Sequence, residues 1–269
     1  MVWRQACQRN PEAARVLGPF QPFLRDMHQE WESALRDFAA SMGCEGGDVI
    51  RVAERKTGRW LSCKEEWPGR TVLGLAGPGG VGKGTLADRL GYPKVVNTTT
   101  RPRRANEVDG VHYHFLTEEE FARREGLNPS PFISVTDRPG RGRYGVQRES
   151  LDTIFSNGSP RVIVEENPLT LQGIMAGVRG SYGQDVRTAI LYVLPPYPIV
   201  GHLATRVAGR CKDSGEEITE QMLESTLGRR QVAEFRSAVD ILQERSTPVL
   251  FVINDDLNRA AKLVAASIS

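Results

Sequence analysis

Two segments of this chain bring together residue types that could bind phosphate. The first, GPGGVGKGT, covers residues 77–85 and combines five glycines with one lysine. The second, NTTTRPRRANEVDGVHYHF, covers residues 97–115 and places three arginines and a tyrosine around an acidic turn. Arginines this close together repel one another unless an anion joins them, so the second segment indicates an anion site. A solvated basic loop is the alternative, but it needs neither the tyrosine nor the acidic turn.

The glycine-rich segment has the context of a phosphate-binding loop, because it lies between an apolar strand, TVLGLAG, and a helix, KGTLADRLG. Backbone N–H groups of such a loop converge on phosphate oxygens at the positive end of the helix, and its lysine reaches the outer phosphates. Most such loops place a Ser or Thr after the lysine to bind Mg²⁺; here Gly84 stands there and Thr85 follows. The expected nucleotide-binding residues are Gly77, Gly79, Gly80, Gly82, Lys83, Gly84 and Thr85.

Composition limits the class of protein. A chain of 269 residues that is 39% hydrophobic can build a sizeable core. Its 35 basic and 33 acidic residues give a net charge of +2, so we expect no nucleic-acid or membrane partner that depends on overall charge. Cys7, Cys44, Cys63 and Cys211 are far apart and form no metal-binding pair, which favours free thiols in the cytoplasm. No apolar run approaches the roughly 20 residues that span a bilayer.

Residues 1–70 are expected to form an N-terminal extension, mainly helical and of unknown role. All four tryptophans precede residue 71, which places a boundary near residues 68–69. NPEAARVLG predicts a short helix with Asn10 as its N-cap and Pro11 at the first helical position. The segment at residues 46–69 is consistent with a hairpin turning near residues 56–58, or with a helix through residues 49–55.

A longer helix is predicted over PFLRDMHQEWESALRDFAASM, because its apolar residues recur at steps of three and four. They are Phe23, Met27, Trp31, Leu35, Phe38 and Met42. We expect this apolar face to pack on the core of the same chain. The alternative is that it binds a partner or forms a homodimer.

Residues 71–269 alternate apolar strands with helices. After the first strand, further strands are predicted at KVVNTTT, RVIVEE, TAILYVL and PVLFVIN, and Thr117 followed by Glu120 predicts a capped helix start. Such alternation predicts an α/β fold of the P-loop NTPase type, with a mostly parallel sheet covered by helices on both faces.

The basic segment gives this second part a family resemblance. TTTRPRRANEVDGVHYHFLTEEEF resembles the segment with which guanylate kinases hold the phosphate of the nucleotide acceptor. The resemblance places Arg101 and Arg104 at the two phosphate-binding arginines and Tyr113 at the phosphate-binding tyrosine. RYGV is similar to a second family motif and makes Tyr144 the other tyrosine on that phosphate. The anion between the arginines would then be the acceptor's monophosphate, and the acceptor-binding region would cover residues 97–146.

The second half of the chain extends the resemblance to residues 71–269. LPPYPIVGHLATRVAGR is similar to the strand and helix that lead into the family's lid, so Arg206 and Arg210 would face the donor phosphates. The lid would cover residues 210–230, with Arg229 as its remaining catalytic arginine and Arg230 or Gln221 as alternatives. VINDDLNRAAKLV is similar to the family's C-terminal stretch and places Asn254 near the adenine of ATP.

The positions that recognise guanine in this family carry other residues here. The resemblance places Ser134 where the family has a glutamate, and Val146 where it has a Ser or Thr. Asp137, in a loop one residue longer than the family's, either replaces that glutamate or only caps the loop. The other expected positions are Asn97 in place of a small hydroxyl residue, Asn167 in place of an aspartate, and Glu165 beside Mg²⁺.

The resemblance implies a phosphotransferase that uses ATP and Mg²⁺ and phosphorylates a nucleoside monophosphate, with GMP or dGMP as the family default. Lys83, Arg206, Arg210 and Arg229 would surround the transferred group. One alternative is a kinase for another phosphorylated small molecule, such as a modified nucleotide or ribose 1,5-bisphosphate. The other is a non-catalytic module that binds a phosphorylated peptide, as guanylate-kinase-like scaffold domains do, although those domains usually lose the loop lysine that this chain keeps.

Overall fold

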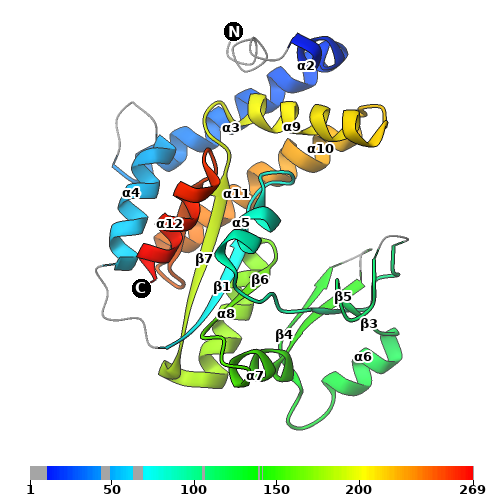
Figure 1. Ribbon diagram of the computed structural model, residues 1–269, viewed down its shortest axis with the longest axis vertical. Coiled ribbons are helices and arrows are strands. Elements are labelled where there is room, and N and C mark those ends of the chain that lie inside the picture. Colours follow the sequence, from blue (N-terminus) through cyan, green and yellow to red (C-terminus); the bar gives the residue numbers. More distant parts are fainter. Residues whose placement is uncertain are drawn as a thin grey trace.

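The computed structural model describes residues 11–43, 49–62, 69–104, 107–138, 140 and 142–268 (Figure 1). Its centre is a four-stranded parallel sheet in the order β6-β1-β7-β8. The strands are β1 (Arg70–Ala76), β6 (Arg161–Glu165), β7 (Val186–Leu194) and β8 (Val249–Ile253). All four are buried almost throughout, as parallel strands covered on both faces must be. The predicted fold class is confirmed.

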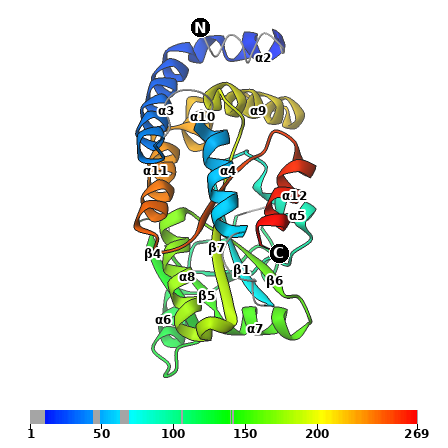
Figure 2. The same cartoon turned by 90° about the vertical axis from the view of Figure 1, so that its left-hand side faces the viewer.

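Helices cover both faces of this sheet. Figure 2 shows α8 and α11 on one side of the strands and α5 and α12 on the other. The helices after β1 are α5 (Lys83–Leu90), α6 (Glu118–Glu125), α7 (Arg148–Ser156), α8 (Pro168–Tyr182), α9 (Ile199–Ser214), α10 (Glu220–Leu227), α11 (Arg229–Glu244) and α12 (Leu257–Ser267), with a short 3-10 turn, η2 (Gly183–Asp185). The predicted cap is present, since Thr117 Oγ1 accepts a hydrogen bond from Glu120 N at the start of α6.

A second, smaller sheet lies beside the first in the order β3-β2-β5-β4. Its strands are β2 (Thr98–Thr99), β3 (His114–Phe115), β4 (Phe132–Arg138) and β5 (Gly142–Gln147). The strand predicted over KVVNTTT is wrong for most of its length, because this segment passes from one sheet to the other. Lys94 bridges Ile163 of the central sheet, and only Thr98 and Thr99 pair within the second.

The N-terminal helices pack on the rest of the chain. They are α2 (Pro11–Val16), η1 (Gly18–Phe20), α3 (Gln21–Ser41) and α4 (Val49–Ser62). Trp31 and Phe38 of α3 lie against Phe235 of α11, with ring centroids 5.6 and 5.5 Å apart. Trp31 Nε1 also donates a hydrogen bond to Leu227 O at 2.9 Å. The apolar face of α3 is therefore covered by its own chain, and a homodimer through the extension would need another surface.

The segment for which the sequence left two options forms a helix, α4, and not a hairpin. Its residues Ile50 and Ala53 are fully buried in the same core as the central sheet. The predicted cap Asn10 lies outside the described residues, as do Cys7, Cys44 and Cys63, whereas Cys211 is a buried free thiol. In the described ranges, no helix combines the length and apolar character needed to cross a membrane.

Candidate active site

The glycine-rich loop connects β1 to α5 and is held in a conformation that only glycine allows. Gly77 has φ +136°, and a Cβ there would lie 2.2 Å from Val193 O of the neighbouring strand. Gly82 has φ +90° and forms the N-cap of α5; a Cβ there would lie 2.5 Å from Asn254 Nδ2. Side chains at these two positions would clash or strain the backbone, so the loop shape depends on both glycines.

Lys83 points back over the loop. Its Nζ donates hydrogen bonds to Gly77 O at 2.9 Å and Pro78 O at 3.1 Å, and lies 3.7 Å from Glu165 Oε1. Burial lowers the pKa of Lys83, and the nearby carboxylates of Glu165 and Glu234 oppose that shift. A partly desolvated ammonium held by neutral carbonyls is well placed for an incoming phosphate.

Arg206 and Asn254 join the loop to the far end of the sheet. Arg206 donates to Gly80 O at 3.1 Å and to Asn254 O at 3.2 Å. Asn254 Nδ2 donates to Val81 O at 2.8 Å. Burial lowers the pKa of Arg206, although the guanidinium stays charged because the ordinary pKa of arginine lies far above neutral pH. The structure therefore brings these two predicted residues onto the loop.

The predicted lid residues divide into two groups. Arg210 lies against the loop: its Nη2 donates to Thr226 Oγ1 at 3.4 Å and approaches to 3.3 Å of the point where a Cβ on Gly80 would lie. Arg229 and Gln221 are exposed and do not line the cavity described below. Arg230, the alternative to Arg229, does line it.

Arg101 and Arg104 meet a carboxylate of their own chain. Arg101 Nη2 donates to Glu107 Oε1 at 2.7 Å, and Arg104 N donates to Glu107 Oε2 at 2.9 Å. The Arg101 hydrogen bond is the main cause that lowers the pKa of Glu107 to about 2. The Arg101 guanidinium lies 5.4 Å from the centre of the Tyr113 ring, and Tyr113 lies 6.0 Å from Tyr144. The arginines and tyrosines predicted for the acceptor phosphate thus form one cluster, but the Arg104 side chain is 76% exposed.

One cavity of about 570 Å³ joins the two sites. At one end it is lined by Gly77, Gly79 and Lys83, and at the other by Asn97, Glu107 and Tyr113. Helix α11 contributes Arg230, Gln231 and Glu234 to its wall. Arg101, Arg104 and Tyr144 do not line the cavity themselves, but Glu107 and Tyr113, which contact Arg101, do. A phosphate donor on the loop and an acceptor beside Tyr113 would therefore meet in the same space.

Comparison with known proteins agrees with this geometry. The family model for guanylate kinase matches residues 69–262. The chain belongs to the guanylate kinase family. A guanylate kinase of Neisseria gonorrhoeae is 33% identical over 194 residues, which are 69% of this chain and 80% of that protein. One of Thermosynechococcus vestitus is 31% identical over 72% of this chain and 90% of its own length. Among solved structures, the guanylate kinase of Anaplasma phagocytophilum is 19% identical with a TM-score of 0.42, and the match covers 76% of this chain and 88% of that one.

Three of the positions that the family resemblance predicts to recognise the base, together with Tyr144, lie around a much smaller cavity. Ser134, Tyr144, Val146 and Asn97 line it. Val146 is buried, so it can offer only an apolar surface there. Asp137 is exposed and lines neither cavity.

Sequence reasoning missed two residues of the acceptor site. Arg138, at the end of β4, forms an ion pair with Glu166 and lies 4.3 Å from the centre of the Tyr144 ring. Glu166 is 6% exposed and lines both cavities. Burial raises its pKa, and Arg138 opposes that shift. Two neighbouring atoms, Asn97 Oδ1 and Arg138 Nε, are buried without a hydrogen-bond partner.

Asn167 carries the signal that could have identified Glu166. Its Oδ1 accepts a hydrogen bond from Thr170 N, so Asn167 is the N-cap of α8, with Pro168 at the first helical position. An Asn-Pro pair at a helix start is a recognised sequence pattern. With the Asn167 side chain occupied in capping, the preceding Glu166 is the residue of this turn that lines both cavities.

Mg²⁺ is implied by the family. Within the described part of the chain, no three His, Cys, Asp or Glu side chains gather into a metal-binding cluster. Thr85 is exposed on the first turn of α5, and Glu165 lies beside Lys83. Both offer oxygen, the donor that Mg²⁺ prefers, and Mg²⁺ takes most of its ligands from phosphates and water. The residues fit an ion that arrives with the nucleotide.

Proposed function

We propose that this protein transfers the γ-phosphoryl group of ATP to GMP or dGMP. The observation that carries the proposal is the cavity lined by the phosphate loop at one end and, at the other, by Glu107 and Tyr113, the two residues that contact Arg101. Phosphoryl transfer asks little covalent chemistry of the protein and depends on positioning and positive charge. Lys83, Arg206 and Arg210 would neutralise the donor phosphates, and Mg²⁺ held by them with Thr85 and Glu165 would offset further charge.

The acceptor phosphate would be held by Arg101, Tyr113 and Tyr144, with exposed Arg104 closing over it. An arginine fork and phenol hydroxyls match the oxygens of a phosphate monoester. No general base is required, because the attacking phosphate oxygen is already an anion near neutral pH. Closure of Arg230 and Arg229 over the donor would exclude water.

For the base, we propose that Glu166 and Arg138 replace the family's glutamate and hydroxyl residues. Guanine presents N–H donors at N1 and N2 and an acceptor at O6. The Glu166 carboxylate can accept from the donors, while the unpaired Arg138 Nε can donate to the acceptor. Asn97 Oδ1 is a second unpaired acceptor on the same wall. Adenine lacks the N1 and N2 donors and would leave Glu166 and Asn97 unmatched.

A second candidate function rests on the same pair. Because Arg138 and Glu166 already contact each other, they occupy the base end of the site, which favours a smaller acceptor without a base. Ribose 1,5-bisphosphate is such a molecule, and its second phosphate would find Arg138.

The experiment is ATP consumption by the purified full chain with Mg²⁺ and a panel of acceptors: GMP, dGMP, AMP, CMP, UMP, dTMP and ribose 1,5-bisphosphate. Lys83→Ala serves as the inactive control. A site that hydrogen-bonds its substrate rejects analogues lacking those groups by roughly 10⁴-fold, so we expect GMP and dGMP to exceed AMP by orders of magnitude. Turnover of ribose 1,5-bisphosphate alone supports the second candidate. ATP binding without turnover of any acceptor contradicts both, and no ATP binding favours a phosphopeptide module.

A further inference from the structure

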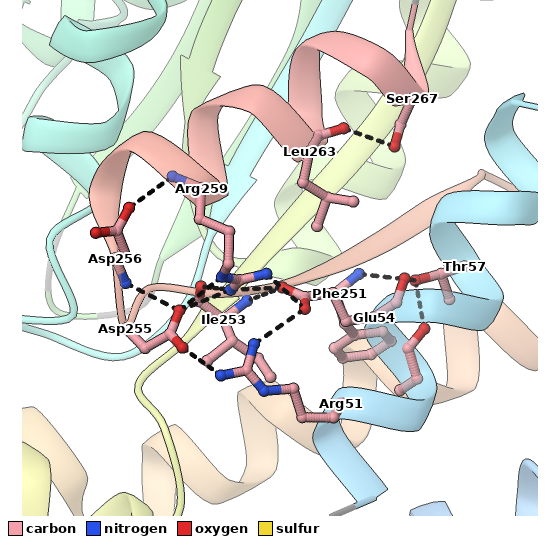
Figure 3. Close-up of polar contacts among 11 residues, drawn as sticks. Arg51, Glu54, Thr57, Phe251, Ile253, Asp255, Asp256, Arg259, Leu263 and Ser267 are labelled. Carbon is pink, nitrogen blue, oxygen red and sulfur yellow. Dashed lines mark hydrogen bonds and ion pairs between the residues drawn. The ribbon is translucent and has the colours of Figure 1, made fainter.

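Helix α4 lies along the free edge of the central sheet (Figure 2). In the described sheet, β8 pairs only with β7, so the outward N–H groups of β8 need other partners. Two of them find acceptors on α4: Phe251 N donates to Thr57 Oγ1 at 3.2 Å, and Ile253 N donates to Glu54 Oε1 at 2.7 Å. Figure 3 shows both hydrogen bonds. A helix therefore takes the place of a fifth strand.

The spacing of residues along a helix and along a strand allows α4 to pair with β8 in place of a strand. Glu54 and Thr57 are three residues apart, which is a rise of about 4.5 Å along a helix. Phe251 and Ile253 are two residues apart, which is about 6.6 Å along a strand. The longer glutamate side chain bridges the difference by reaching beyond its own helical turn.

Glu54 also binds the helix that follows the strand. Arg259 of α12 donates to both carboxylate oxygens of Glu54, at 2.9 and 3.1 Å, and to Ile253 O at 2.5 Å. The Glu54 side chain is 5% exposed. A buried carboxylate is tolerated only when it is paired and hydrogen-bonded. Glu54 thus ties the end of β8 to the first turn of α12.

A second acidic residue also links α4 to α12. Asp255 contacts Arg51 of α4 and Arg259 of α12. Asp256 caps α12 by accepting from Arg259 N at 2.7 Å. Asn254 lies between Ile253 and Asp255, and both of these neighbours are held in this way.

Asn254 is also the residue that contacts the phosphate loop, through Val81 O and the Arg206 guanidinium. We infer that Glu54 is a positioning residue for the ATP site: from a helix outside the family match, it fixes the end of β8 and thereby holds Asn254 against the loop. This inference rests on the proposed use of ATP. The N-terminal extension then contributes to the donor site. Removing it would weaken the contact between Asn254 and the phosphate loop as well as uncover β8.

The test compares five full-length proteins: wild type, Glu54→Ala, Glu54→Gln, Thr57→Val and Arg55→Gln. Arg55 is exposed on the same helix and is the matched control. The probe is N-methylanthraniloyl-ATP with Mg²⁺, followed by its fluorescence, so binding is measured without an acceptor. Thermal melting is recorded for each variant.

We expect Glu54→Ala to raise the probe Kd about tenfold, the loss expected for one hydrogen bond to a buried charged group. Glu54→Gln keeps an oxygen for Ile253 N but loses the charge that faces Arg259, so about threefold is expected. Thr57→Val lowers the melting temperature but leaves the Kd within about twofold, because Phe251 is farther from Asn254. With an active acceptor, KM for ATP follows the Kd and KM for the acceptor does not change.

An unchanged Kd for both Glu54 variants alongside a lowered melting temperature would overturn the inference and leave Glu54 a stabilising residue only. Equal Kd increases for Glu54→Gln and Thr57→Val would also overturn it, because the effect would then follow general loosening. If Glu54→Ala does not fold, Glu54→Gln decides. If the wild-type protein does not bind the probe, the proposed function itself is wrong. This outcome distinguishes failure of the proposed function from failure of the inference about Glu54.

Discussion

The two ends of the cavity hold their cations in different ways. At the donor end, Lys83 and Arg206 hydrogen-bond to backbone carbonyls of the loop. At the acceptor end, Arg101 is paired with Glu107, and Arg138 with Glu166. Lys83 also lies 3.7 Å from Glu165 Oε1, but Arg101 Nη2 lies only 2.7 Å from Glu107 Oε1, so carboxylates match the acceptor arginines more closely than the donor cations.

This difference separates binding from selection. A loop whose cations are held mainly by backbone carbonyls can bind any nucleoside triphosphate through its phosphates. An acceptor must instead compete with, or share, two existing ion pairs, and only a molecule that replaces those contacts gains affinity. We therefore expect the acceptor end to set the specificity of this chain.

The largest expected effect is at the donor end. Lys83→Ala should lower kcat by roughly 10²–10³-fold, because a preorganised donor to the transferring group is lost. Steady-state kinetics with the best acceptor measure it, and Lys262→Ala on the exposed face of α12 is the control. Near-normal turnover of Lys83→Ala would show that the donor end does not depend on this cation, and would contradict the comparison between the two ends.

Arg101→Ala should act on the acceptor alone. We expect KM for the acceptor to rise about 10- to 100-fold, the range for one charged hydrogen bond, while KM for ATP stays within about twofold. Arg104→Ala should have a smaller effect, since its side chain is mostly exposed. Equal increases in both KM values would show that the two ends are not separate.

The central sheet and its helices could be predicted from the sequence, because buried parallel strands are continuous apolar runs and helices have regular apolar spacing. The phosphate loop and the arginine and tyrosine cluster could be predicted because their motifs are local. The path of residues 94–99 could not, since it depends on two sheets that form only in the folded chain. The choice of helix for α4 likewise depends on the edge of β8, almost 200 residues away.

The ion pair between Arg138 and Glu166 could not be predicted from the sequence, because it too joins segments that are far apart along the chain. Arg138 ends β4 and Glu166 follows β6, and no spacing in the sequence shows that they meet. Family comparison directed attention to Ser134 and Val146, positions where a residue is lost. The proposed replacement, Glu166, is next to Asn167, and a position-by-position comparison passes over it.

Glu166→Gln tests selection at the acceptor end. The amide keeps the shape but can no longer accept two N–H groups and leaves Arg138 without its partner, so we expect GMP preference over AMP to fall at least tenfold, with ATP affinity unchanged. The ratio of kcat/KM for the two acceptors measures it. Asp137→Asn is the matched control, because Asp137 is exposed and outside the cavity. Loss of preference in Asp137→Asn alone would restore Asp137 as the residue that recognises the base.

The smallest expected effect is on acid stability, and it follows from Glu107. The ordinary pKa of this carboxyl is 4.5, and its hydrogen bond with Arg101 lowers the pKa to about 2 in the folded chain. A lowered carboxyl pKa stabilises the folded state above 4.5, and this stabilisation is lost as pH falls from 4.5 towards about 2. The melting temperatures of wild type and Glu107→Gln should therefore differ most above pH 4.5 and converge in that window.

Glu120→Gln is the control for this prediction. Glu120 also has a pKa lowered to about 2, but by Arg123 and Arg124 on α6, outside the cavity. We expect its stability to converge with wild type in the same acid window without any change in KM for the acceptor. Glu107→Gln should change both the acid stability and KM for the acceptor, because it removes the carboxylate that pairs with Arg101 and holds the arginine in place. If Glu107→Gln, like Glu120→Gln, leaves KM for the acceptor unchanged, the Arg101–Glu107 pair is only a surface ion pair. The acceptor then does not have to compete with this pair, and the contrast with the donor end is lost.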